Sequence, residues 1–298
     1  MGSNTNIRVL VTNPQYTTET KLNHSVDEND QAGRRYWDAV WADGQLPMPV
    51  NPRARGFRHL YNRRVDAMFR QAFASMETRG KSLVEIGCAR SAWLPYFGRE
   101  FGFRVSGLDY SELGCEQERQ ILSRSGVEGE IVCADMLAPP APWAEAFDVA
   151  VSFGVIEHFR ETTNCLRALT TLVKPGGILI TQIPNMTGLI GRLQKLMNPA
   201  TYAVHVPLTR EQLRTAHERA GLHIVHCDYF LSTGFGVVSL HGLDQGRIST
   251  RVKRAVLSLM KKSSVLIWAL ENATAPLPAT RQFAPAIVCV ARRAAKAA

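Results

Sequence analysis

Residues 81–92, with the sequence KSLVEIGCARSA, constrain the fold of this chain more than any other stretch. Leu83, Val84 and Ile86 form the apolar run of a buried parallel strand, and Glu85 lies near the carboxyl end, where such a strand meets a ligand. A turn of mostly small residues follows, so its backbone and the start of the next helix could approach a nucleotide closely. This turn alone could serve a dinucleotide, an adenosyl group or only close helix packing.

Strands alternate with helices after this turn, which predicts a doubly wound, Rossmann-like α/β sheet. We expect seven strands, mostly parallel, with the last strand antiparallel and at the sheet edge. The predicted strands cover residues 81–86, 103–111, 129–136, 147–154, 178–185, 222–229 and 285–292.

Carboxylates follow two of these strands at the edge where a ligand would bind. Asp109 ends the second strand, about 20 residues beyond the turn, where a carboxylate can bind the paired hydroxyls of a ribose. Asp135 ends the third strand and could accept a hydrogen bond from an adenine amino group, with Met136 against the ring. The sequence therefore favours an adenosyl ligand over bare packing.

Five motifs occur in order within residues 80–230: 84–87 (VEIG), Asp109, 135–136 (DM), 153–158 (FGVIEH) and 172–180 (LVKPGGILI). With them the chain resembles the class I S-adenosylmethionine-dependent methyltransferases, in the broad group that includes the ubiquinone-biosynthesis methyltransferases. The resemblance implies S-adenosyl-L-methionine as the cofactor. It also implies a set of cofactor-binding residues: Glu85, Gly87, Cys88, Ala89, Asp109, Tyr110, Asp135, Met136, Phe153 and Gly154.

The sequence departs from the family pattern at two places. Ala89 and Ser91 replace the second and third glycines of the usual Gly-x-Gly-x-Gly turn. Ubiquinone-type enzymes that use a divalent metal carry Glu-x-x-Glu-His after strand four, whereas residues 154–158 read GVIEH and lack the first carboxylate. Because one Glu and one His are few ligands for a hard cation, we expect no metal site and a metal-independent reaction.

The chain divides into three predicted regions. Residues 1–30 form a loosely ordered arm, residues 31–80 a helical cap with Tyr36 and Trp37 on the substrate side, and residues 81–298 the methyltransferase domain. Two insertions are expected in that domain, 186–208 over the substrate side and 231–284 before the last strand. His205, in the first insertion, is predicted to face the substrate. The second insertion contains a basic amphipathic helix over residues 251–270.

Methyl transfer from a sulfonium is an in-line displacement that needs the donor and acceptor held collinear. We predict a small-molecule acceptor, with His158 as the general base and Glu157 orienting it. A cofactor-lining or structural role for His158 stays open, because many methyl acceptors need no base. Two rival functions also stay open: a catalytically silent methyltransferase-like partner subunit, and a nicotinamide-dependent oxidoreductase.

Composition limits the partners and the compartment. The formal charge of +9 comes from 35 Lys and Arg against 26 Asp and Glu, but basic and aromatic residues are not interleaved, so we expect no nucleic acid. The six dispersed cysteines favour a reduced, cytoplasmic protein. No apolar stretch is long enough for stable membrane insertion. A surface contact of residues 251–270 with a membrane and a homo-oligomer both stay open.

Overall fold

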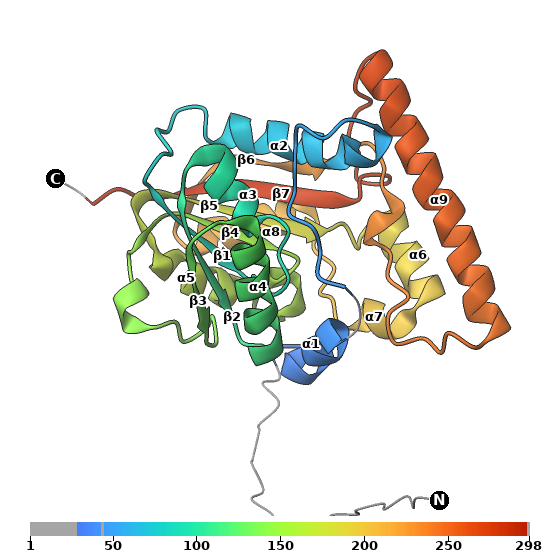
Figure 1. The fold of residues 1–298 in the computed structure, drawn as a ribbon, viewed down its shortest axis with the longest axis horizontal. Helices are drawn as coiled ribbons and strands as arrows, with labels where there is room; N and C mark the ends of the chain where they lie inside the picture. The colour runs from blue at the N-terminus through green and yellow to red at the C-terminus, as the bar shows by residue number, and fades with distance from the viewer. Residues whose placement is uncertain (1–28, 43–44, 297–298) are drawn as a thin grey trace, which may run out of the picture.

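The computed structural model describes residues 29–42 and 45–296 (Figure 1). The predicted arm over residues 1–30 therefore lies outside the described residues, apart from Asn29 and Asp30. Asp30 forms an isolated antiparallel bridge with Phe159, which follows the fourth strand. This bridge ties the start of the described chain to the carboxyl edge of the sheet.

The centre of the fold is a seven-stranded sheet with the order β3-β2-β1-β4-β5-β7-β6. β7 pairs antiparallel with both of its neighbours, and every other pairing is parallel. The fold class predicted from the sequence is thus confirmed. The strands are β1 (Ser82–Ile86), β2 (Arg104–Asp109), β3 (Gly129–Cys133), β4 (Phe147–Phe153), β5 (Val173–Pro184), β6 (Leu222–Phe230) and β7 (Ala286–Arg293).

The expected place of the last strand is wrong, because β7 lies between β5 and β6 and β6 forms the sheet edge. The physical reason is visible in the sequence of β7. Its residues 286–291, AIVCVA, are all buried, which is typical of a strand covered on both faces and paired on both sides. In β6 polar and charged residues are interspersed, as in His223, His226 and Asp228, and several positions are exposed, as suits an edge.

Helices cover both faces of the sheet, and successive residues of β1 point to opposite layers. Leu83 packs with Phe69 and Phe97 on one face, whereas Val84 packs with Leu166 and Leu213 on the other. The helices of these layers are α2 (Leu60–Ala72), α3 (Leu94–Phe101), α4 (Glu112–Ser125), α5 (Thr162–Leu172) and α8 (Arg210–Arg219).

Local signals in the sequence fix where several of these helices begin. Ser111 caps α4 by accepting a hydrogen bond from the Gly114 N–H. Thr209 caps α8 and forms a capping box with Gln212. Because Ser111 follows Asp109 at the end of β2, the cap also fixes the turn that presents Asp109 at the carboxyl edge.

The segment predicted as a helical cap separates into two parts. α1 (Gly33–Ala42) lies beside α4 at the carboxyl edge of the sheet (Figure 1). α2 instead joins the hydrophobic core, with Phe69 fully buried against the sheet layer. Of these two helices, α1 is therefore the one placed to cover a ligand at that edge.

The two predicted insertions pack against each other at one side of the molecule. The first holds α6 (Leu189–Met197) and α7 (Pro199–Ala203), and the second holds α9 (Ile248–Ala273). Ile190 and Met197 pack with Leu257 in a small separate cluster that joins α6 to α9. No helix in the described part of the chain has both the length and the apolar character needed to cross a bilayer.

Candidate functional site

The turn after β1 requires glycine at its first position. Gly87 has a φ of 74°, and a Cβ on it would lie 2.3 Å from Cγ2 of Val155, so any side chain would force the turn apart. Ala89 fits where the family has glycine because it faces Gly114 of α4, where an added Cβ would lie 2.4 Å from the Ala89 methyl group. The missing glycine of the turn is thus compensated by a glycine on the facing helix.

Asp109 links the end of β2 to this turn. Its Oδ2 accepts a hydrogen bond from the Ala89 N–H at 3.1 Å, and its Oδ1 accepts one from the Ser111 N–H at 2.8 Å. Burial raises the pKa of Asp109, and these backbone donors oppose that rise by stabilising the charged form. The Tyr110 N–H is a third backbone donor to this carboxylate, whose oxygens together offer about four acceptor sites, so acceptor capacity for a ligand hydroxyl remains.

Two further buried carboxyls flank the same turn. Ser91 Oγ donates to Glu85 Oε2 at 2.8 Å, and the Ser91 N–H donates to Glu118 Oε2 at 2.6 Å. Burial raises the pKa of Glu85 to about 8 and that of Glu118 to about 9, and for Glu118 the charge of Glu85 adds to the effect. Glu118 Oε1 is buried without a hydrogen-bond partner. This pair is suited to a positively charged ligand.

Glu118 is not among the site residues predicted from the sequence. It lies on α4 between Cys115 and Ile121, which are both buried, so an acidic side chain occupies the buried face of an otherwise amphipathic helix. A charge at such a position is the signal that could have found it.

α1 is fastened across this edge by side chains from β2, α4 and the turn. Ser111 Oγ donates to Asp38 Oδ1 at 2.6 Å, and the Tyr110 hydroxyl donates to Asp30 Oδ2 at 3.0 Å. Arg90, which has a φ of 53°, donates from Nη2 to the Gln45 carbonyl at 2.6 Å and from Nη1 to the Trp41 carbonyl at 3.3 Å. These contacts make α1 a cover over the turn and the end of β2.

Polar atoms remain unsatisfied beneath that cover. Trp41 Nε1 and Gln117 Oε1 are both buried and have no hydrogen-bond partner. Buried donors and acceptors of this kind are usually paired, so these two atoms are available to a polar ligand or to water.

Two histidines meet beyond the end of β4. His158 Nδ1 lies 2.6 Å from the Val204 carbonyl and His205 Nδ1 lies 2.7 Å from the Thr201 carbonyl, so each Nδ1 carries the proton that it donates. Their rings lie 4.6 Å apart, and Trp37 of α1 packs edge-to-face on His158 at 5.1 Å. Burial lowers the pKa of both histidines to about 4, so both are neutral at pH 7.

Glu157 completes this group. Both of its carboxylate oxygens are buried without a hydrogen-bond partner, and Oε1 lies 3.9 Å from His158 Nε2. Burial raises the pKa of Glu157 to about 8. One potential ligand atom from each of Glu157, His158 and His205 lies within 4.8 Å of the other two, and no other such group of three or more occurs among the described residues.

The remaining predicted residues take different places. Asp135 is exposed and accepts from the Leu137 N–H at 2.8 Å, while Met136 joins the core layer. Cys88 is fully buried and points at Gly107 of β2, away from the edge. Phe153 packs with Phe69 and Trp93, Tyr36 packs on Trp37, and Gly154 has a φ of 69°.

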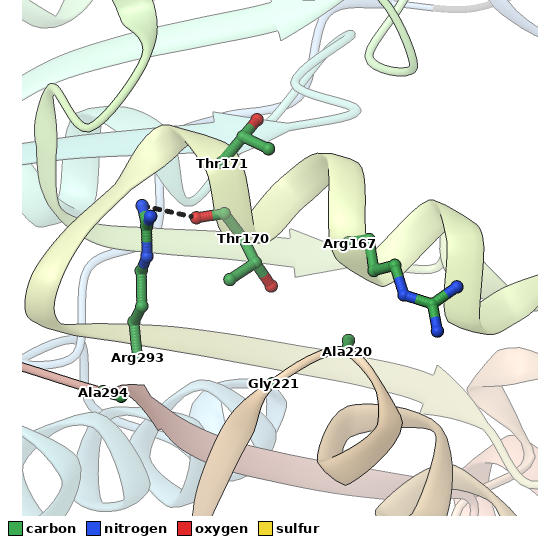
Figure 2. A pocket seen from close by; sticks show the side chains of 7 residues that line it. All are labelled: Arg167, Thr170, Thr171, Ala220, Gly221, Arg293 and Ala294. Atoms are coloured by element: carbon green, nitrogen blue, oxygen red, sulfur yellow. Dashed lines mark hydrogen bonds between the residues drawn. The ribbon is translucent and has the colours of Figure 1, made fainter.

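A shallow cavity of about 420 Å³ lies at the opposite edge of the sheet (Figure 2). Arg293 donates there to the Thr170 and Val173 carbonyls, where β5 begins. None of the predicted site residues lines this cavity, whose residues are Arg167, Thr170, Thr171, Ala220, Gly221, Arg293 and Ala294.

Comparison with known proteins identifies a methyltransferase family. Residues 57–227 match the family model described as a methyltransferase domain. A ubiquinone biosynthesis O-methyltransferase of Salmonella typhimurium is 26% identical over 177 residues, which cover 58% of this chain and 67% of that protein. The same enzyme of Stutzerimonas stutzeri is 34% identical over 100 residues, and this chain spans only 42% of its length.

Solved structures share the fold at low identity. The [4+2]-cyclase SpnF has a TM-score of 0.57 at 16% identity and covers 90% of this chain and 97% of its own. A putative sarcosine dimethylglycine methyltransferase from Galdieria sulphuraria has a TM-score of 0.54 at 12% identity, with coverages of 88% and 98%. The family model spans more than half of the chain and includes the turn and Asp109. The chain therefore belongs to the class I S-adenosylmethionine-dependent methyltransferases.

Proposed function

We propose that this enzyme transfers the methyl group of S-adenosylmethionine to a small-molecule acceptor by in-line displacement. The observation that carries the proposal is the neutral His158 and His205 pair, which lies under α1 at the same sheet edge as Asp109 and Glu85. The relatives named ubiquinone biosynthesis O-methyltransferases support a hydroxyl group as the acceptor. The [4+2]-cyclase SpnF has the same fold but is named for another reaction, so the fold alone does not support methyl transfer.

The residues of the turn fit the cofactor. Asp109 would bind the ribose hydroxyls, and Glu85 with Glu118 would bind near the positive charges of the methionine end, since both carboxyls are buried without an ion pair among the described residues. When bound, the cofactor supplies an electrophilic methyl group on a sulfonium. The chain itself orients that group and excludes water through α1.

In a reaction without a metal, His158 would accept the proton of the acceptor hydroxyl. Its Nδ1–H is held by the Val204 carbonyl, so Nε2 carries the lone pair that a base needs. Its lowered pKa keeps it neutral at pH 7 but makes it a weak base. A hydroxyl would therefore need a second group to help release its proton.

We propose a divalent cation as that group, in place of the metal-independent reaction expected from the sequence. That expectation counted only Glu157 and His158 as donors, whereas the fold adds His205. Glu157, His158 and His205 would hold the cation, and Nδ1 of each histidine already donates to a backbone carbonyl, as is typical of histidines that bind metal. Nε2 of His158 would then bind the cation instead of taking the proton, which would pass to solvent. A cation held by these residues would lower the pKa of an acceptor hydroxyl.

Thermal unfolding with three ligands tests the proposed function. S-adenosylmethionine and its demethylated product are expected to raise the melting temperature, and NADH is expected to leave it unchanged. Mass spectrometry of a metabolite mixture incubated with enzyme and cofactor should then find a product heavier by one methyl group. Stabilisation by the cofactor without any methylated product would favour the silent partner subunit instead.

Cofactor binding is expected to release protons. Glu85 and Glu118 have pKa values of about 8 and about 9, so both are largely protonated at pH 7, and a cationic ligand beside them lowers these pKa values. Cofactor affinity should therefore rise as pH increases from neutrality toward 9. Calorimetry in phosphate and in Tris buffer measures the release as a difference in binding enthalpy. Equal enthalpies in the two buffers would contradict it, and Glu118→Gln should reduce the difference.

Arg90→Ala is expected to release the α1 cover. The substitution removes the hydrogen bonds to the Gln45 and Trp41 carbonyls. Bound S-adenosylmethionine should then dissociate about tenfold faster, with little change in melting temperature. Arg53→Ala, which removes an exposed ion pair with Glu100, is the matched control for stopped-flow measurement of dissociation. Equal rates for the two variants would show that α1 does not retain the cofactor.

A further inference from the structure

α9 presents a second apolar face that the protein does not cover. Its buried side chains, which include Leu257 and Trp268, pack toward the body of the molecule. Large apolar side chains on another side of the helix are 45% to 78% exposed. We call them the outer stripe: Ile248, Val252, Val256, Leu259, Leu266 and Leu270.

The spacing of the outer stripe places its members along one line. They are three, four or seven residues apart, which brings them to the same side of a helix with about 3.6 residues per turn. From Ile248 to Leu270 the stripe runs for about 33 Å at the helical rise. Figure 1 shows α9 at one side of the molecule, with α2 and α6 on one flank of it. A contiguous exposed apolar surface of this length indicates a binding partner.

The charge of α9 indicates what kind of partner this is. Between residues 247 and 270 the helix region has no acidic residue, and Glu271 is buried against Arg64. Arg251 and Lys262 border the outer stripe, and neither forms an ion pair with a described acidic residue. The basic residues of this stretch are Arg247, Arg251, Lys253, Arg254, Lys261 and Lys262.

Two more of these cations lie beside a shallow hollow. A cavity of about 360 Å³ between residues 236–240 and α9 is lined by Arg254 and Lys261. Val237, at its rim, is 37% exposed. Basic groups therefore extend from the border of the outer stripe around one side of the helix.

A second copy of this chain fits this surface poorly. Two α9 helices packed through their outer stripes would place the cations bordering one stripe against those bordering the other, without acidic partners. A bilayer that contains anionic lipid accepts both features, since apolar side chains enter the boundary between headgroups and acyl chains while Arg and Lys meet lipid phosphates.

We propose that α9 lies flat on the surface of a bilayer containing anionic lipid and holds the enzyme there through its outer stripe. This contact does not depend on which acceptor is methylated. The helix is a surface element, because neither it nor another described helix is suited to cross the bilayer. Through Leu257 and its packing on α6, the bound helix would bring the insertion that carries His205 close to the membrane.

Sedimentation of the full-length protein with vesicles tests the proposal. The protein should sediment with vesicles of phosphatidylcholine and phosphatidylglycerol, and much less with phosphatidylcholine alone. Leu259→Glu combined with Leu266→Glu should lower the bound fraction about tenfold or more, and Arg251→Glu combined with Lys262→Glu should lower it similarly. Val225→Glu, at an exposed apolar residue of the edge strand β6, is the matched control and should bind as the wild type does.

Two outcomes would overturn the proposal. One is equal sedimentation of the wild type and the Leu259→Glu, Leu266→Glu variant. The other is a wild-type dimer in analytical ultracentrifugation that this variant loses, with no vesicle binding, because a second copy would then cover the outer stripe. All these substitutions replace exposed side chains, so circular dichroism should show the same fold in each variant.

Discussion

Asp109→Ala is expected to weaken the binding of S-adenosylmethionine by about a hundredfold or more. The carboxylate is buried at the end of β2, and its oxygens would accept hydrogen bonds from the ribose hydroxyls. Losing two hydrogen bonds to a charged acceptor costs about 3 kcal/mol, which corresponds to about a hundredfold in affinity. Isothermal calorimetry of the cofactor measures the change directly.

Asp109 also holds the turn, so the experiment needs a control for folding. The substitution removes the acceptors of the Ala89 and Ser111 N–H groups, and some loss of melting temperature is expected in the ligand-free protein. Asp135→Ala is the matched control, since it removes an exposed carboxylate from the neighbouring strand end and should weaken binding only a few-fold. Unchanged cofactor affinity in a folded Asp109→Ala protein would refute the ribose assignment.

The sheet could be predicted because its signals are local. Apolar runs such as 83–86 and 286–291 mark buried strands. Asp109 ends β2 as predicted, and Asp135 lies two residues after the end of β3. The position of β7 between β5 and β6 was not predicted. Strand order depends on pairing between segments that are distant in the sequence. The continuous apolar run 286–291 was the one signal that β7 is not an edge strand.

The sequence predicted those site residues that lie at the carboxyl ends of strands. The acidic Glu118 on the buried face of α4 was a signal in the sequence, but its contact with the turn, and those of Arg90 with the Gln45 and Trp41 carbonyls, depend on the tertiary fold. His205 was expected on the substrate side, but its approach to His158 depends on how α7 folds back over the end of β4. The prediction of no metal site counted only Glu157 and His158, because the third potential donor, His205, comes from a distant insertion.

Glu157→Gln is expected to abolish most cation binding at the site that we propose beside His158. Removing a carboxylate ligand should weaken Mn²⁺ binding by about a hundredfold, because a neutral amide compensates little of the metal charge. Calorimetry with Mn²⁺ on protein freed of metal by a chelator measures this without any acceptor. His205→Gln should lose affinity as well. His217→Gln is the matched control, since His217 is equally buried but bonds Thr181 on another part of the sheet.

The stability of the metal-free protein gives an independent readout of the same carboxyl. Its folded pKa of about 8 lies above the ordinary value of 4.5, so Glu157 binds its proton more tightly when folded. The protonated Glu157 therefore contributes to the free energy of unfolding below about pH 4.5. This contribution is lost as pH rises to about 8. Glu157→Gln cannot lose a proton, so its melting temperature should fall less over that range, and Mn²⁺ should restore the wild type but not the variant. If Mn²⁺ stabilises neither protein at pH 8, Glu157 stays an unpaired buried acid and the proposed cation site is wrong.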